Sequence, residues 1–144
     1  MERASNIPSF TTPDINKERG EIERISMEVF GDQNTQDFFS GFLEVAKTAP
    51  LVELSDDIWS RLENTDSYDI PRQGWAIVEE HAVGGHPDHP RDWQFYKTLY
   101  EQNGVIEAPM ILKKGDLYHL VSGNTRLMVA RSLGITPKVL LVEL

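Results

Sequence analysis

The fold is decided by residues 117–130, which read LYHLVSGNTRLMVA. Apolar residues at the start of this stretch predict a strand, and Gly123 then permits a tight turn. The apolar run that follows predicts a helix beginning at about Asn124, and Gly134 is typical of a residue that ends a helix. The stretch therefore predicts a strand, a glycine turn and a helix in immediate succession.

The residues on either side of this unit predict the sheet to which it belongs. A turn at Lys114-Gly115-Asp116 separates two apolar runs and indicates a hairpin, and the chain closes with a further apolar run. We therefore expect an α+β fold in which strands 109–113, 117–122 and 138–143 share a small mixed sheet. Helix 124–133 is expected to pack on that sheet.

The N-terminal half is predicted to be mainly helical. Apolar residues at helical spacing indicate a helix over 21–31, and Asn34 can cap a second helix that ends before Pro50. Residues 51–54 predict a short strand, and Ser55 can cap a short helix with an acidic start. Further along, 75–78 could form a strand and 81–90 a loop. The aromatic residues Trp93, Phe95, Tyr96 and Tyr100 follow helical spacing, which favours a core helix over a base-stacking surface.

Length and composition set the limits on the class of protein. The 144 residues suit one domain with a core, for which we expect a flexible arm over 1–20 and a single domain over 21–144. No apolar run approaches the roughly 20 residues that span a bilayer, and the first residues lack the apolar core of a signal peptide. The absence of cysteine excludes disulfides and cysteine-ligated zinc. These features predict a cytoplasmic protein without membrane association.

The charge balance restricts the partners. Fourteen Lys and Arg residues against 23 Asp and Glu residues give a net charge of −9. Proteins that track the nucleic-acid backbone usually carry a basic stripe, because neutralising phosphates drives their affinity. The densest basic features are only Lys113-Lys114 and Arg126 with Arg131. Broad non-specific DNA binding is therefore disfavoured, whereas a local site for one phosphate group is compatible with the sequence.

The glycine turn is the best candidate for that local site. The first backbone N–H groups of a helix have no partner within the helix, and the helix dipole adds positive charge there, so the start at Gly123, Asn124 and Thr125 would attract an anion. Arg126 adds a guanidinium that can hold an oxyanion, and its loss should weaken anion binding without unfolding the protein. The alternative is that Asn124 or Thr125 only caps the helix while Arg126 pairs with an internal carboxylate.

The order of these elements resembles the ParB/sulfiredoxin superfamily. The resemblance covers roughly residues 91–144 and consists of a proline, a strand, a turn, a second strand, Gly-x-x-Arg, a helix, Leu-Gly and a last strand. It implies a ParB/sulfiredoxin-like fold preceded by a mainly helical elaboration. It also implies that Gly123, Asn124, Thr125 and Arg126 hold the phosphates of ATP or another nucleotide.

The departures from the family restrict the activity. The sulfiredoxin cysteine is missing, so sulfinic acid repair is excluded, and Asn124-Thr125-Arg126 stands in place of the partition-protein Glu-Arg-Arg motif. We therefore expect neither the partition function nor the DNA-binding domain that accompanies it. Among the activities that the resemblance implies, the remaining ones are magnesium-dependent phosphoryl transfer and ATP hydrolysis, as in a kinase or nucleotide phosphohydrolase. The alternative is a non-catalytic binding or regulatory module, or an accessory protein in DNA processing, with a protein partner docked on the helical N-terminal half.

Phosphoryl transfer needs a carboxylate that holds Mg²⁺ or orients the acceptor. Glu53, Asp56 and Asp57 are the candidates, because a strand-to-helix turn can direct acidic side chains into a cleft. The alternative is an ordinary acidic helix start.

The histidines are weaker candidates for a functional role. His81, His86 and His89 could be metal ligands or part of a mobile lid, but their spacing matches no standard motif, and no metal site is assigned to them. Alternation along its strand makes His119 a core or interface histidine.

Overall fold

The computed structural model describes residues 9–63, 65 and 93–144, and they form an α+β fold. The helices are α1 (Arg19–Glu28), α2 (Thr35–Ala46), α3 (Asp56–Arg61), α5 (Trp93–Glu101) and α6 (Asn124–Ser132), with a 3-10 helix at Ile15–Glu18. The strands are β1 (Ser9–Thr11), β2 (Leu51–Glu53), β3 (Leu62–Glu63), β4 (Val105–Glu107), β5 (Met110–Lys114), β6 (Leu117–Ser122) and β7 (Lys138–Glu143). The expected strand at 75–78 and loop at 81–90 lie outside the described residues.

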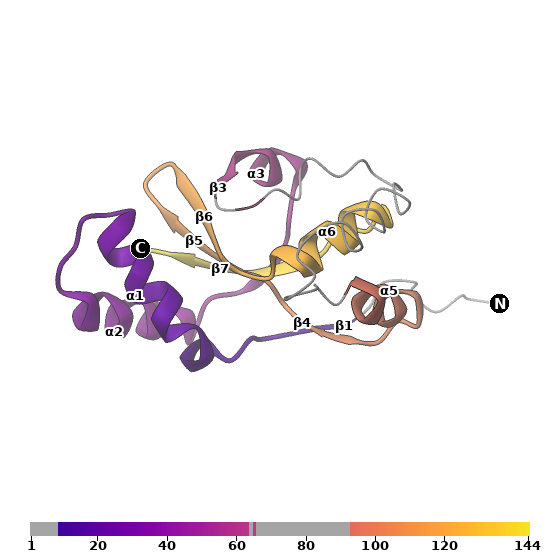
Figure 1. Ribbon diagram of the computed structural model, residues 1–144, viewed down its shortest axis with the longest axis horizontal. Coiled ribbons are helices and arrows are strands. Elements are labelled where there is room, and N and C mark those ends of the chain that lie inside the picture. Colours follow the sequence, from indigo (N-terminus) through magenta and orange to yellow (C-terminus); the bar gives the residue numbers. More distant parts are fainter. Residues whose placement is uncertain (1–8, 64, 66–92) are drawn as a thin grey trace, which may run out of the picture.

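Five strands form a mixed sheet in the order β2-β7-β5-β6-β3. β5 and β6 are an antiparallel hairpin, β7 runs parallel to β5, and β3 runs parallel to β6. The three strands expected to share a sheet are therefore neighbours in it, and α6 connects β6 to β7 (Figure 1). This part of the sequence prediction is confirmed.

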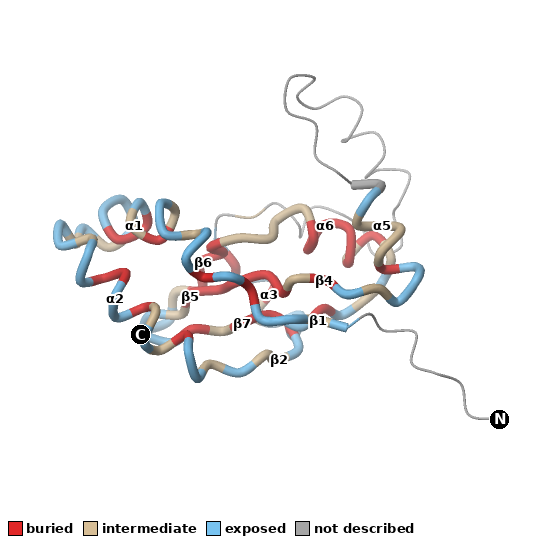
Figure 2. Tube along the Cα trace, turned by 90° about the horizontal axis from the view of Figure 1, so that it is seen from below, coloured by how far each residue is buried: buried red, intermediate tan, exposed pale blue. Residues whose placement is uncertain are grey.

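Helices cover both faces of this sheet. On one face α1 and α2 bury an apolar stripe that includes Ile22, Phe38 and Phe42 against β5 and β7. On the other face α3, α5 and α6 bury Trp59, Tyr100 and their neighbours against β5 and β6. Figure 1 shows α1 and α2 on one side of the sheet, with α3 and α6 on the other. Figure 2 shows the burial concentrated in β5, β6, β7 and α6.

Several of the expected helix boundaries are confirmed by their capping contacts. The Asn34 side chain accepts a hydrogen bond from the Asp37 N–H at 3.2 Å, and Ser55 Oγ accepts one from the Ile58 N–H at 3.2 Å. At the far end of α5, Asn103 has a positive φ of 54°, which ends the helix. These ends follow from local chemistry, because short polar side chains satisfy the backbone groups that a helix leaves open.

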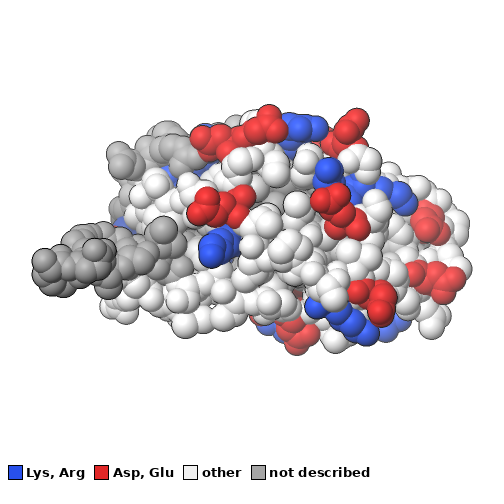
Figure 3. Space-filling view, turned by 180° about the vertical axis from the view of Figure 1, so that it is seen from behind, with Lys and Arg blue, Asp and Glu red and all other residues white. Residues whose placement is uncertain are grey.

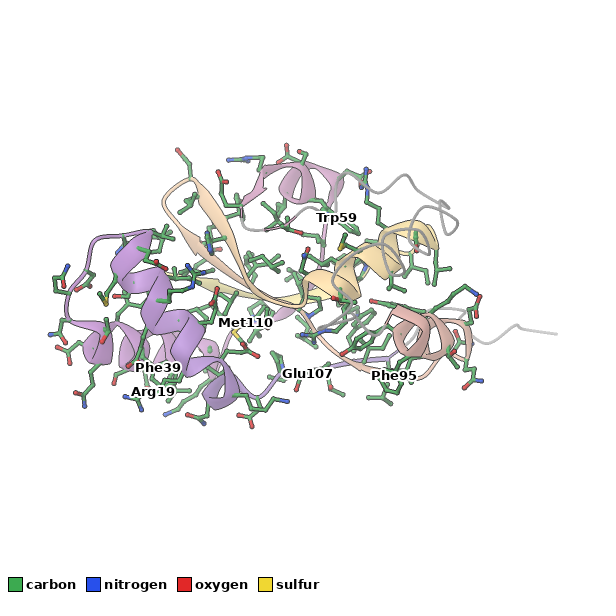
Figure 4. The ribbon with its side chains drawn as sticks, in the orientation of Figure 1. Arg19, Phe39, Trp59, Phe95, Glu107 and Met110 are labelled. Atoms are coloured by element: carbon green, nitrogen blue, oxygen red, sulfur yellow. The ribbon has the colours of Figure 1, made fainter. Side chains whose placement is uncertain are left out.

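Two expectations differ from the structure. Residues 9–20 were expected to belong to a flexible arm, but β1 pairs in parallel with β4, and the 3-10 helix buries Ile15. The N-terminal segment is ordered here because strand pairing with residues almost 100 positions away supplies hydrogen bonds that no local pattern reveals. Phe95 was expected in the core, but it is 52% exposed on α5 (Figure 4).

Candidate site at the start of helix α6

The junction of β6 and α6 requires glycine for two reasons. Gly123 has φ of +105°, a left-handed conformation that residues with a side chain rarely adopt. A Cβ atom placed there would also lie 2.6 Å from Pro109 Cβ and 2.9 Å from Pro109 Cα. The chain therefore passes from strand to helix at the single residue that can turn while touching the proline before β5.

The first turn of α6 points its N–H groups out of the helix at this junction. The Leu127 N–H donates to the Gly123 carbonyl at 2.9 Å, which is the first bond of the helix. Gly123 is the residue before the helix and has no side chain to cap it, and no acidic residue lies in the first turn. Gly123, Asn124 and Thr125 are partly exposed. The positive end of the helix dipole is therefore not neutralised by a carboxylate of its own first turn.

A second part of the chain reaches the start of α6. β3 runs parallel to β6 and ends at Glu63 beside His119, three residues before the end of β6. Two residues beyond β3, the Thr65 hydroxyl donates a hydrogen bond to Asn124 Oδ1 at 2.6 Å. In open sheets, ligands bind outside the carboxyl ends of parallel strands. Sequence reasoning missed Thr65, because nothing local indicates that it meets a residue 59 positions away.

Arg126 takes part in an internal ion pair rather than pointing out of the helix end. Its side chain is 10% exposed, and its Nη1 donates to the Glu107 backbone carbonyl and lies 3.7 Å from Glu107 Oε1. The other carboxylate oxygen of Glu107 accepts from the Asp14 N–H and lies 3.6 Å from Lys17 Nζ. Arg126 thus adopts the pairing with an internal carboxylate that the sequence left open as its alternative role.

Tyr100 holds the same part of α6 from the side of α5. Its buried hydroxyl donates to the Arg126 backbone carbonyl at 3.1 Å. Burial raises the pKa of Tyr100 well above its usual range, and the nearby Arg126 charge only partly opposes this shift. The first turn of α6 is therefore fixed by Glu107 from β4 and by Tyr100 from α5. Figure 4 labels Glu107, the residue where these contacts meet the N-terminal segment.

The three candidate catalytic carboxylates do not meet at this junction. Glu53 ends β2, which lies three strand positions from β6, or about 14 Å at roughly 4.8 Å per strand. Asp56 and Asp57 are exposed at the start of α3, and Asp57 pairs with Arg61 at 3.4 Å. α3 contacts α6 near the opposite end of α6, where the Arg131 guanidinium is 5.4 Å from the Trp59 ring centroid.

Two further observations concern metals and membranes. Within residues 9–63, 65 and 93–144, no group of three or more His, Asp or Glu side chains is arranged to hold a metal ion. His81, His86 and His89 lie outside these residues. None of the described helices is long and apolar enough to cross a bilayer.

Comparison of the chain with protein-family models, with curated proteins and with solved structures gave no significant match. The resemblance to the ParB/sulfiredoxin superfamily therefore stays a prediction, as do the nucleotide and Mg²⁺ that it implies.

Proposed function

We propose that this protein binds a nucleotide through its phosphates at the junction of β6 and α6. The observation that carries the proposal is the start of α6, where Gly123 brings the chain directly from a strand into a helix. The partly exposed helix start carries N–H groups directed along the helix axis and the positive end of the dipole, which together suit a phosphate. The ParB/sulfiredoxin-like fold is part of the same proposal and is supported by the order of β5, β6, α6 and β7.

The role of Arg126 in this proposal is positioning. Because its guanidinium is directed to Glu107, it holds the first turn of α6 in place, and the backbone of Gly123, Asn124 and Thr125 supplies the contacts to phosphate. This differs from the role that the sequence indicated, in which the guanidinium itself gripped the anion.

A binding module is favoured over an enzyme by the placement of the three candidate carboxylates, Glu53, Asp56 and Asp57. Phosphoryl transfer needs a carboxylate near the transferred phosphate, to hold Mg²⁺ or to orient the acceptor. Glu53 lies several strands away, and α3 contacts α6 near its last turn. Charged side chains of both signs alternate over the face in Figure 3, so binding at one local site suits this surface better than binding along a nucleic acid.

The proposal is tested by ATP binding, measured by calorimetry with and without Mg²⁺. Asn124→Asp places a carboxylate in the first turn of α6. This carboxylate interacts favourably with the helix dipole but repels a bound phosphate. We expect this substitution to weaken binding about tenfold or more, the equivalent of losing one charge-assisted contact. Gln36→Glu makes the same change of charge in the first turn of α2 and should leave binding unchanged.

The outcomes separate the alternatives. No heat of binding with wild-type protein, with or without Mg²⁺, would contradict the proposal, and so would equal binding by the Asn124→Asp variant. Release of phosphate from ATP that stops on chelation of Mg²⁺ would assign the protein to the enzymes instead. Binding without turnover supports the module.

A further inference from the structure

His119 is a buried histidine whose ring has no hydrogen-bond partner among the described residues. It lies in the middle of β6 and is only 7% exposed. Neither Nδ1 nor Nε2 is within hydrogen-bonding reach of a donor or acceptor in that part of the chain. An unsatisfied buried polar group is costly, so this ring stands out from the buried side chains around it.

The register of the sheet places His119 on the face covered by α1 and α2. Its neighbour across the hairpin is Leu112, and cross-strand neighbours share a face. Leu112 and Val121 belong to the apolar cluster built on Ile22 and Ile25 of α1. The sequence predicted a core or interface histidine here, and the structure places His119 in the interface between the sheet and the α1–α2 layer.

The charges around His119 come from α1 and from β3. On α1, the Arg24 guanidinium is held by Glu21 at 2.5 and 2.9 Å and by Glu28 at 2.5 Å. On β3, Glu63 is the register partner of His119. Burial lowers the pKa of His119 below its usual value, and Arg24 lowers it further, whereas Glu21 and Glu63 oppose this effect.

We propose that His119 makes the packing of α1 on the sheet sensitive to acid, so that protonation of its ring releases α1 while the α6 side of the sheet stays folded. A neutral imidazole leaves one donor and one acceptor without partners among the described residues, which costs less than burying a charge. An imidazolium carries two N–H donors that must be solvated, and water reaches the ring only if α1 moves away. α1 is the element whose displacement would expose the ring, because its apolar side packs in the apolar cluster built on Ile22 and Ile25, and its polar side is exposed.

The direction of the pH effect follows from proton linkage. Released or unfolded chain binds a proton at His119 near pH 6.5, whereas the packed state binds it only at lower pH. The packed state therefore loses stability as the pH falls below about 6.5, and the loss continues until the pH passes the lower pKa of the packed state. Within that window the equilibrium for release shifts by up to about tenfold per pH unit.

Amide hydrogen exchange tests this proposal, with protection factors used to correct for intrinsic rates. Between pH 7.5 and 5.5 we expect protection of Ile22, Ile25 and Ser26 in α1 to fall by up to about tenfold, while Leu127 and Val129 in α6 keep theirs. His119→Leu should keep α1 protected over the whole range. The combined change of His81, His86 and His89 to Gln is the matched control, and it should leave the acid effect in place.

Titration of the wild-type His119 ring by NMR provides a second measurement that does not depend on the variant folding. A midpoint below 6.5 supports the proposal, and a midpoint at or above 6.5 overturns it. Equal loss of protection in α1 and α6 would overturn it as well, since the whole molecule would then unfold together.

Discussion

The two faces of the five-stranded sheet differ in the hydrogen bonding of their buried polar groups. On the α6 face, Arg126 is bonded to Glu107, Tyr100 to the Arg126 carbonyl, and Ser132 Oγ to the Val129 carbonyl at 2.7 Å. On the α1–α2 face, Ser26 Oγ donates to the Asp32 carbonyl at 2.8 Å, whereas the buried ring of His119 has no hydrogen-bond partner among the described residues. Polar groups that join separate elements can specify one arrangement of them, whereas an unpartnered buried histidine is the basis of the acid sensitivity that we propose for the α1–α2 layer.

The proposed binding site lies on the face that is held by these polar contacts. Binding at the start of α6 requires that the first turn stays in one place, and Glu107 and Tyr100 supply that constraint. The opposite layer is joined to the sheet mainly by apolar packing of Ile22, Phe39 and Phe42. A change in that layer should therefore leave the proposed site intact, and the following experiments test how far the two faces differ.

Gly123→Ala should have the largest effect. The left-handed backbone costs a non-glycine residue about 1–2 kcal/mol, and the clash with Pro109 adds about 1–3 kcal/mol, for a total loss of about 2–5 kcal/mol. Gly115→Ala is the matched control, because Gly115 has φ of +61° but nothing within 4 Å of an added Cβ. Gly115→Ala should therefore lose only the stability that the left-handed backbone costs, about 1–2 kcal/mol. Denaturant unfolding measures both, and equal losses would show that the contact with Pro109 relaxes freely.

Arg126→Met should destabilise the protein by about 2–3 kcal/mol, since it removes a buried charged donor and leaves Glu107 without that partner. On the other face, Arg24→Met removes exposed ion pairs with Glu21 and Glu28 and should cost less than about 1 kcal/mol. The sequence predicted that loss of Arg126 would spare folding. Thermal unfolding measures the loss of stability in both variants. A smaller loss for Arg126→Met than for Arg24→Met would favour the role at the ligand that the sequence predicted for Arg126.

Tyr100→Phe should have the smallest effect, a loss of about 1 kcal/mol from one buried hydrogen bond to the Arg126 carbonyl. The aromatic ring remains to pack against Phe10, whose centroid lies 6.2 Å away. If the hydroxyl positions α6, the same variant should also weaken ATP binding. Unchanged binding together with lower stability would limit Tyr100 to a structural role.

Much of the chain could be predicted because its signals are local. The hairpin of β5 and β6, the glycine turn into α6 and the caps at Asn34 and Ser55 all depend on residues within a few positions of one another. Such contacts depend only on the local sequence, since side-chain spacing and backbone preference act before the fold is complete. The three central strands and the α6 helix were therefore expected at nearly the positions that they occupy.

The contacts of the candidate site could not be predicted in the same way. β1 pairs with β4, Thr65 bonds to Asn124 and Arg126 bonds to Glu107, and each of these contacts joins segments that lie far apart in the sequence. The guanidinium of an arginine near a helix start can bind an external anion or an internal carboxylate. The sequence around that arginine is the same in both cases. Which of the two it meets depends on whether another element brings a carboxylate within reach.

That a glycine joins β6 to α6 could be predicted from the sequence, because the alternation of one element and the helical spacing of the next leave no other residue for the turn. That Arg126 turns inward, and that His119 has no hydrogen-bond partner among the described residues, became visible only in the folded structure. Both outcomes depend on which side chains arrive from distant strands and helices, and burial then makes the presence or absence of a partner energetically decisive.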